Sequence, residues 1–207
     1  MAGALDLFYR NLARPLHFRS RLLIGLLALP LVIASAGPLW NIHMVAPQYP
    51  QGLDLDIYAY TVTGDIAEVN TLNHYIGMAR IDRASLTDLD WIPFALGTLI
   101  VLTLRVASIG DKRSLVDLSV LFLYFSLFSL ARFYLKLYVF GHNLDPAAPF
   151  DVQPFMPAFL GTKQIANFTT SSFPQWGSLG VGVYGIGLLF ALRWNLRLGT
   201  REAQRAG

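Results

Sequence analysis

Four apolar stretches constrain this chain more than any other feature, because each approaches the roughly 20 residues that a helix needs to cross a bilayer. They cover residues 22–40, 91–108, 115–140 and 177–194. The tryptophans stand at the ends of these stretches, where indole rings prefer the membrane interface: Trp40, Trp91, Trp176 and Trp194. We therefore predict an all-α membrane bundle of four transmembrane helices.

The composition agrees with a membrane protein. Of the 207 residues, 54% are hydrophobic and 14% are charged, whereas soluble domains carry about 25% charged residues. This balance excludes a disordered chain, a nucleic-acid binder with a basic surface and an ordinary soluble enzyme. Cysteine is absent, so disulfides, zinc–thiolate sites and cysteine nucleophiles are excluded as well.

The distribution of lysine and arginine predicts the orientation. The connections 41–90 and 141–176 contain only Arg80, Arg83 and Lys163. Most other cations lie in or next to the N-terminal segment 1–21, the short connection 109–114 and the tail 195–207. The positive-inside rule then places both termini in the cytoplasm and both long connections outside.

Residues 1–36 also resemble a secretory signal, with arginines before an apolar run and Ala34-Ser35-Ala36 as a cleavage motif. The apolar character continues through Leu39 and Trp40, as it does in a retained span. We interpret the segment as a retained span and leave cleavage open. The predicted topology of the connections is the same in both cases.

The two long connections are expected to form a small α+β extracytoplasmic domain. Residues 53–60 alternate between apolar and polar, which predicts a half-buried strand. Asp65 and Glu68 fit a capping box for a helix that continues to about Gly77. One strand and one helix bury too little surface to fold alone, so connection 41–90 should pack on connection 141–176 or on a partner.

Histidine and methionine are concentrated in the outer connections. Imidazole and thioether groups together suit copper(I), and the candidate ligands are His43, Met44, His74, Met78, His142 and Met156. His74 and Met78 are four residues apart and share a helix face if the helix extends past Gly77. Alternatively, these side chains only pack or form hydrogen bonds, without a metal.

Arg132 and Lys136 lie four residues apart near the outer end of the third span. Long cationic side chains there can extend to the outer headgroups. In the alternative interpretation they face the protein and pair with outer acids such as Asp54, Asp56 or Asp65, because an unpaired cation in a membrane is costly. In the fourth span, glycines such as Gly182 and Gly185 predict close helix packing, within the bundle or with a partner subunit.

Residues 38–53 and 72–78 contain three motifs, P-L-W, A-P-x-Y-P-x-G-L and L-N-H-Y-I-G-M. They resemble a family of small bacterial membrane proteins, some of which are encoded near nitrous-oxide reductase and other copper-respiration maturation genes. The resemblance implies a bacterial inner-membrane protein, and it places His74 and Met78 in the family motif.

No catalytic constellation is visible, so we expect a protein that is not an enzyme. Our leading hypothesis is an accessory protein that binds or transfers Cu(I) outside the membrane, for maturation of a copper respiratory enzyme. The main alternative is a metal-free structural or assembly subunit of a respiratory complex, with Asn73, His74 and Tyr75 fixing the outer loop. A third possibility is a small enzyme or lipid-site protein in which Arg132 and Lys136 hold a phosphate headgroup.

Overall fold

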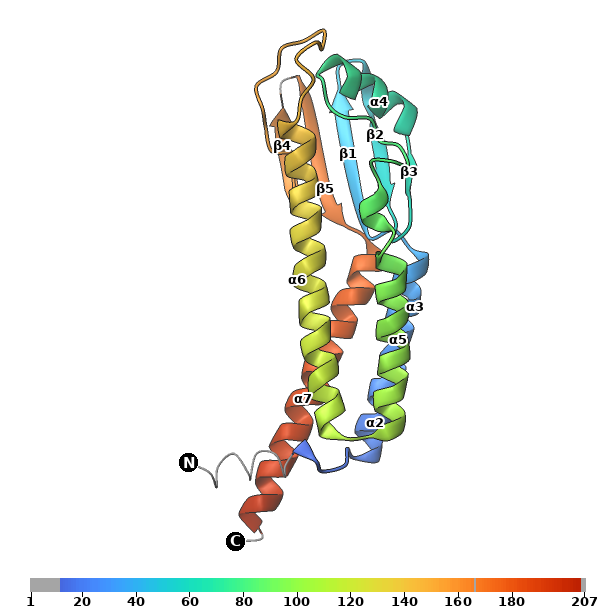
Figure 1. Ribbon diagram of the computed structural model, residues 1–207, viewed down its shortest axis with the longest axis vertical. Coiled ribbons are helices and arrows are strands. Elements are labelled where there is room, and N and C mark those ends of the chain that lie inside the picture. Colours follow the sequence, from blue (N-terminus) through green and yellow to red (C-terminus); the bar gives the residue numbers. More distant parts are fainter. Residues whose placement is uncertain (1–11, 166, 206–207) are drawn as a thin grey trace. The chain divides into compact units, whose positions relative to one another are not determined.

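The computed structural model describes residues 12–165 and 167–205, with side chains described up to residue 197 (Figure 1). Its helices are α2 (Phe18–Leu26), α3 (Ala28–Ala36), α4 (Ile66–Tyr75), the 3₁₀ helix η1 (Thr87–Leu89), α5 (Ile92–Ile109), α6 (Lys112–His142) and α7 (Trp176–Arg205). Its strands are β1 (Trp40–Ala46), β2 (Tyr49–Ile57), β3 (Val62–Gly64), β4 (Gly161–Ile165) and β5 (Phe168–Pro174).

Four helical segments among the described residues are long and apolar enough to cross a membrane. They are Phe18–Ala36, Thr87–Ile109, Lys112–His142 and Trp176–Arg197. The chain is therefore a helical membrane protein with a small β region, which confirms the predicted fold class.

The first span ends earlier than the predicted boundary at residue 40. Helix α3 ends at Ala36, and Trp40 is the first residue of β1, where it pairs with Ile57 on one side and Pro174 on the other. The helical prediction for residues 37–40 was wrong because apolar character alone does not distinguish the end of a helix from a buried strand.

The chain divides into two compact units. The helical unit contains Met1–Ile33, Ala95–Ser126 and Gly180–Gly207. The sheet unit contains Ala34–Phe94 and Leu127–Leu179. Each unit has its own core.

Tyr184 occupies the core of the helical unit. It is fully buried on α7, and its hydroxyl lies 2.8 Å from the Thr103 hydroxyl on α5. The ring of Phe122 on α6 meets the Tyr184 ring edge-on, with 4.9 Å between the centroids. The Thr103 hydroxyl gives the buried Tyr184 hydroxyl the polar partner that such a group usually has. Through its contacts with Thr103 and Phe122, Tyr184 joins α7 to both α5 and α6.

The sheet unit contains a five-stranded antiparallel sheet in the order β3-β2-β1-β5-β4. Strand β1 pairs with both β2 and β5, so the two long connections share one sheet. Their predicted packing on each other is thus confirmed. The strand expected at residues 53–60 is observed at Tyr49–Ile57, whereas β1, β3, β4 and β5 were not predicted as strands.

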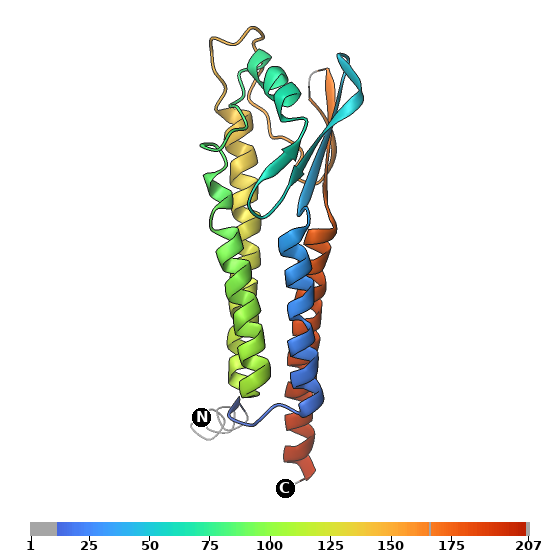
Figure 2. The same cartoon turned by 90° about the vertical axis from the view of Figure 1, so that its right-hand side faces the viewer.

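One face of this sheet is covered by α4 and by the end of α6 that belongs to the sheet unit (Figure 2). The buried cluster there consists of Leu53, Leu55, Val62 and Val69. Helix α4 ends at Tyr75, before Gly77, whose φ is 77°. A left-handed glycine after the last turn is a common helix terminator.

The expected capping box at the start of α4 is absent. Asp65 precedes the helix, but its side chain makes no capping hydrogen bond. Instead, its carboxylate accepts a hydrogen bond from the Asp54 backbone N–H, at 2.8 Å. This carboxylate therefore joins β2 to the beginning of α4, and it accepts no hydrogen bond from the first N–H groups of the helix.

Candidate functional site

The covered face of the sheet borders a cavity of about 170 Å³ within the sheet unit. Strands β1 and β2, helices α4 and α6, and residues 76–89 all contribute to its wall. Representative lining residues are Met44, Leu55, Leu72, Met78, Leu137 and Phe140. An apolar cavity of about 150 Å³ is known to stay dry and to bind small hydrocarbons, so this one is large enough for part of an apolar ligand.

Strand alternation explains why the cavity is apolar. Successive side chains of a strand point to opposite faces of the sheet. On β1, Ile42 and Met44 line the cavity, whereas His43 between them contacts Asp54, with Nδ1 3.0 Å from Oδ1. Asn73 borders the cavity, but its amide already donates to the Ala79 carbonyl at 3.3 Å.

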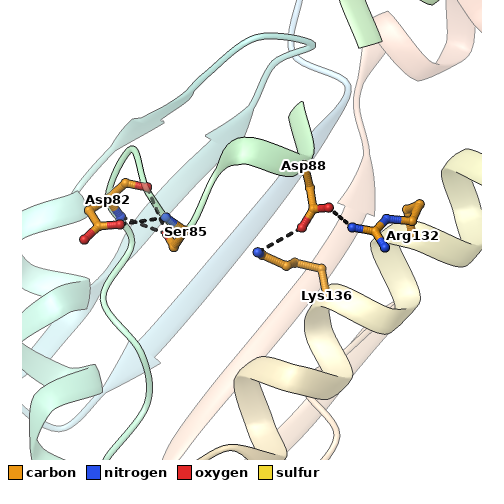
Figure 3. A network of polar contacts seen from close by, with 5 residues as sticks. All are labelled: Asp82, Ser85, Asp88, Arg132 and Lys136. Carbon is orange, nitrogen blue, oxygen red and sulfur yellow. Dashed lines mark hydrogen bonds and ion pairs between the residues drawn. The ribbon is translucent and has the colours of Figure 1, made fainter. Parts of the chain in front are cut away.

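Charged side chains meet at one part of the cavity wall. Asp88 of η1 and Lys136 of α6 both line it, and Asp88 Oδ2 lies 2.9 Å from Lys136 Nζ. The other carboxylate oxygen, Oδ1, pairs with Arg132 (Figure 3). Because residues four apart lie on one helix face, Arg132 and Lys136 can reach the same carboxylate. We call these three residues the Asp88 clasp.

The clasp is only partly shielded from solvent. The side chains of Asp88, Lys136 and Arg132 are 24%, 29% and 45% exposed. Lys136 Nζ also lies 5.6 Å from the centroid of the Phe140 ring, within range of a cation–π interaction. The clasp therefore forms a charged, partly solvent-accessible part of the wall of an otherwise apolar cavity.

Both cations pair with an acid, as in the alternative interpretation of the sequence. That interpretation named Asp54, Asp56 and Asp65 as examples of partners, whereas Asp88 pairs with both cations. Asp54 and Asp56 instead accept hydrogen bonds from the Asn41 amide, at 3.3 and 2.9 Å. Because Asn41 and His43 are odd-numbered residues of β1, they face away from the cavity side of the sheet. One feature of the sequence could have identified Asp88 as a partner of these cations. It lies three residues before Trp91, at the outer end of the second span, and Arg132 and Lys136 lie near the outer end of the third.

The structure does not bring the six candidate copper ligands together at one site. Met44 and Met78 both line the cavity. His43 lies on the other sheet face, and His74 is exposed, with its ring 6.2 Å from that of Tyr75. The predicted shared helix face of His74 and Met78 is absent because α4 ends at Tyr75.

The two remaining candidates also have other contacts. His142 stacks on Tyr138 with 3.8 Å between the ring centroids, and its Nδ1 lies 3.0 Å from the Tyr138 carbonyl oxygen. The Met156 carbonyl accepts a hydrogen bond from Lys163 Nζ at 2.8 Å. Within the described part of the chain, no group of three or more His, Cys, Asp or Glu side chains could hold a metal ion.

The predicted packing residues differ in their surroundings. Asn73 is buried, and Tyr75 is 45% exposed, with its carbonyl accepting from the Phe150 N–H at 3.0 Å. A Cβ atom at Gly185 would stand 2.7 Å from the Phe122 ring, so this glycine does permit close helix packing. At Gly182, no described atom lies within 4 Å of the corresponding Cβ position.

Comparison of the sequence with protein-family models and with curated proteins finds no match.

Proposed function

We propose that this protein is a non-catalytic multi-pass membrane protein that holds an acyl chain of a membrane lipid in the cavity of its sheet unit. The cavity itself is the observation that carries this proposal. The cavity has a volume of about 170 Å³ and mostly apolar walls. An apolar ligand that fills it would remove those walls from water, which is favourable.

The location of the cavity favours a lipid as the ligand. Lys136 and Leu137 on its wall belong to α6, which is one of the candidate membrane spans. In this proposal the sheet unit lies on the extracytoplasmic side of a bacterial inner membrane, an orientation that the distribution of cations in the sequence favours. There, the abundant apolar molecules next to α6 are the acyl chains of the outer leaflet.

Photocrosslinking tests this proposal. The full chain is reconstituted in nanodiscs that contain phosphatidylcholine with a diazirine in its acyl chain, irradiated, and mapped by peptide mass spectrometry. We expect crosslinks at Leu72 on α4 and at Leu55 on β2, which line the cavity and lie outside the four candidate spans. Crosslinks confined to the spans would contradict the proposal.

A matched pair of variants links these crosslinks to the cavity. Val62→Phe adds volume at a residue of the cavity wall, whereas Val45→Phe makes the same change at an exposed strand position. We expect Val62→Phe to reduce crosslinking at Leu72 by about tenfold, or about 1.4 kcal/mol in binding, because the larger side chain occupies space that the acyl chain would fill. Val45→Phe should leave the yield unchanged.

Copper handling is a second candidate function, favoured by the two thioethers of Met44 and Met78 on one cavity wall. Methionine sulfur is a ligand that suits Cu(I). In this proposal the protein passes Cu(I) to a copper respiratory enzyme or to its maturation proteins. Cu(I) titration of the purified chain tests it: Met44→Leu with Met78→Leu should abolish binding, whereas His74→Ala should not. Binding that depends on His74 but not on the methionines would contradict this site.

A further inference from the structure

The polar groups on the cavity wall are unevenly distributed. Thr170 is 4% exposed and Asn73 is 6% exposed, and the Asn73 amide is occupied by a backbone carbonyl. The charged groups on the wall are Asp88 and Lys136, which belong to one clasp. A ligand in this cavity therefore meets apolar surface along most of its length and charge at one place.

The clasp carries more positive than negative charge. One carboxylate stands between two cations, so the three side chains have a net charge of +1 when all are ionised. A guanidinium has five N–H donors and an ammonium has three, more than the two oxygens of one carboxylate engage. The 45% exposure of Arg132 leaves room for a further acceptor beside it. A single anionic group would balance this charge.

The position of Arg132 on α6 relative to Trp91 suits contact with a lipid headgroup. The ring of Trp91 meets that of Phe128 on α6 at 5.0 Å, and tryptophans at span ends prefer the membrane interface. Arg132 and Lys136 follow Phe128 by one and two turns, about 6 and 12 Å along the helix. The headgroup layer extends roughly 5–8 Å beyond the hydrocarbon core, so Arg132 reaches into it.

We propose that the lipid held by the cavity is anionic, with its phosphate bound by Arg132 and Lys136 while one acyl chain enters the cavity. This inference rests on the proposed lipid binding and adds the headgroup class. A diester phosphate supplies one negative charge and two acceptor oxygens, which matches the surplus charge of the clasp and the bidentate geometry of a guanidinium. A zwitterionic headgroup contains the same phosphate, but its quaternary ammonium group would add a positive charge beside Arg132 and Lys136, which disfavours it.

The test compares two probes with the same diazirine acyl chain, phosphatidylglycerol and phosphatidylcholine, in nanodiscs that contain both at equal concentration. The readout is the ratio of their crosslinks at Leu72. For the unmodified chain we expect phosphatidylglycerol to exceed phosphatidylcholine by about thirtyfold, from about 1 kcal/mol for each of the two engaged cations. Arg132→Gln with Lys136→Gln should bring the ratio to about one by lowering the yield of phosphatidylglycerol crosslinks.

Two further variants test whether the clasp itself sets this ratio. Asp88→Asn keeps both cations and removes the competing carboxylate, so the ratio should rise. Arg83→Gln with Lys163→Gln removes two other cations of the sheet unit, which pair with Asp90 and the Met156 carbonyl, and should leave the ratio unchanged. An equal fall in this control would show a general surface attraction and overturn the proposal.

The remaining outcomes distinguish a failure of the proposed headgroup preference from a failure of the proposed acyl-chain binding. A ratio near one in the unmodified chain, with strong crosslinking at Leu72, would overturn the anionic headgroup and leave acyl-chain binding standing. Absence of crosslinks at Leu72 with both probes would overturn the lipid proposal itself. A calorimetric titration with inorganic phosphate identifies the source of the phosphate. We expect no binding of inorganic phosphate to the unmodified protein. If inorganic phosphate binds and Arg132→Gln abolishes that binding, the clasp is a site for free phosphate and not for a lipid headgroup.

Discussion

Asp88 shows how much one residue can decide in this protein. Its two carboxylate oxygens pair with two cations of α6, and it lies within a short 3₁₀ helix of three residues. Such a short element makes few hydrogen bonds of its own. The ion pairs therefore attach residues 79–91 to α6 and close one side of the cavity.

We predict that Asp88→Asn destabilises the sheet unit. The change leaves Arg132 and Lys136 facing each other without the charge that separates them. Exposed pairs contribute up to about 1 kcal/mol, and loss of one partner of a buried pair costs about 3–5 kcal/mol. For this partly exposed clasp we expect about 1–2 kcal/mol, measured by thermal unfolding in detergent, with faster proteolysis between residues 79 and 91.

Asp90→Asn is the matched control. Asp90 lies two residues away and pairs with Arg83, whose side chain is 71% exposed. Its loss should change the melting temperature little, because an exposed pair contributes little. Equal destabilisation by the two substitutions would mean that the clasp has no special role in holding this segment.

Helix α7 contains one glycine that meets a neighbouring helix and one that does not. Gly185 faces the Phe122 ring of α6, whereas Gly182 has open space at its Cβ position. Both glycines belong to the same small-residue pattern in the sequence. The pattern indicates close packing but does not show which of its members meets a neighbouring helix.

We predict that Gly185→Leu lowers the free energy of unfolding by about 1–3 kcal/mol, the usual cost of overpacking. Gly182→Leu serves as the control and should leave the stability of the monomer unchanged. Both are measured by thermal unfolding, with size-exclusion chromatography run in parallel. If Gly182→Leu destabilises the chain as much as Gly185→Leu, the contact between Gly185 and Phe122 does not determine the packing of α7 in the helical unit.

At the scale of the whole molecule, both units are built from segments that are far apart in the chain. The sheet unit combines residues 34–94 with 127–179, and its central strand β1 pairs with β5. This arrangement requires both long connections to lie on the same side of the membrane. The positive-inside prediction places that side outside the cytoplasm.

Single-cysteine labelling tests the orientation, and because the chain has no natural cysteine, only the introduced thiol can react. Gln164→Cys lies at an exposed position of β4, and Arg113→Cys at an exposed position near the start of α6. In intact spheroplasts, a membrane-impermeant maleimide should label only Gln164→Cys. Arg113→Cys should react only after permeabilisation. The reverse pattern would place the sheet unit in the cytoplasm.

The four spans could be located from the amino-acid sequence alone, because about 20 consecutive apolar residues have few other stable states in a bilayer. The sequence also indicated that Arg132 and Lys136 were unusual, since cations near a span end are costly unless they are paired or reach the interface. Both inferences depend on local properties, which a sequence contains directly. For the same reason, local alternation identified the position of β2.

The contacts between segments, in contrast, become visible only in the folded chain. The pairing of β1 with β5 joins Trp40 to Pro174 across most of the chain, and no local pattern encodes a partner at that distance. Asp88, and not Asp54 or Asp56, pairs with the cations of α6, because the side-chain alternation along β2 turns Asp54 and Asp56 to the other face of the sheet. The cavity depends on side chains from all five strands, from α4 and α6, and from the connections next to them, and only folding sets the distances between these segments. Contacts between remote segments are therefore the part of this protein that its sequence did not reveal.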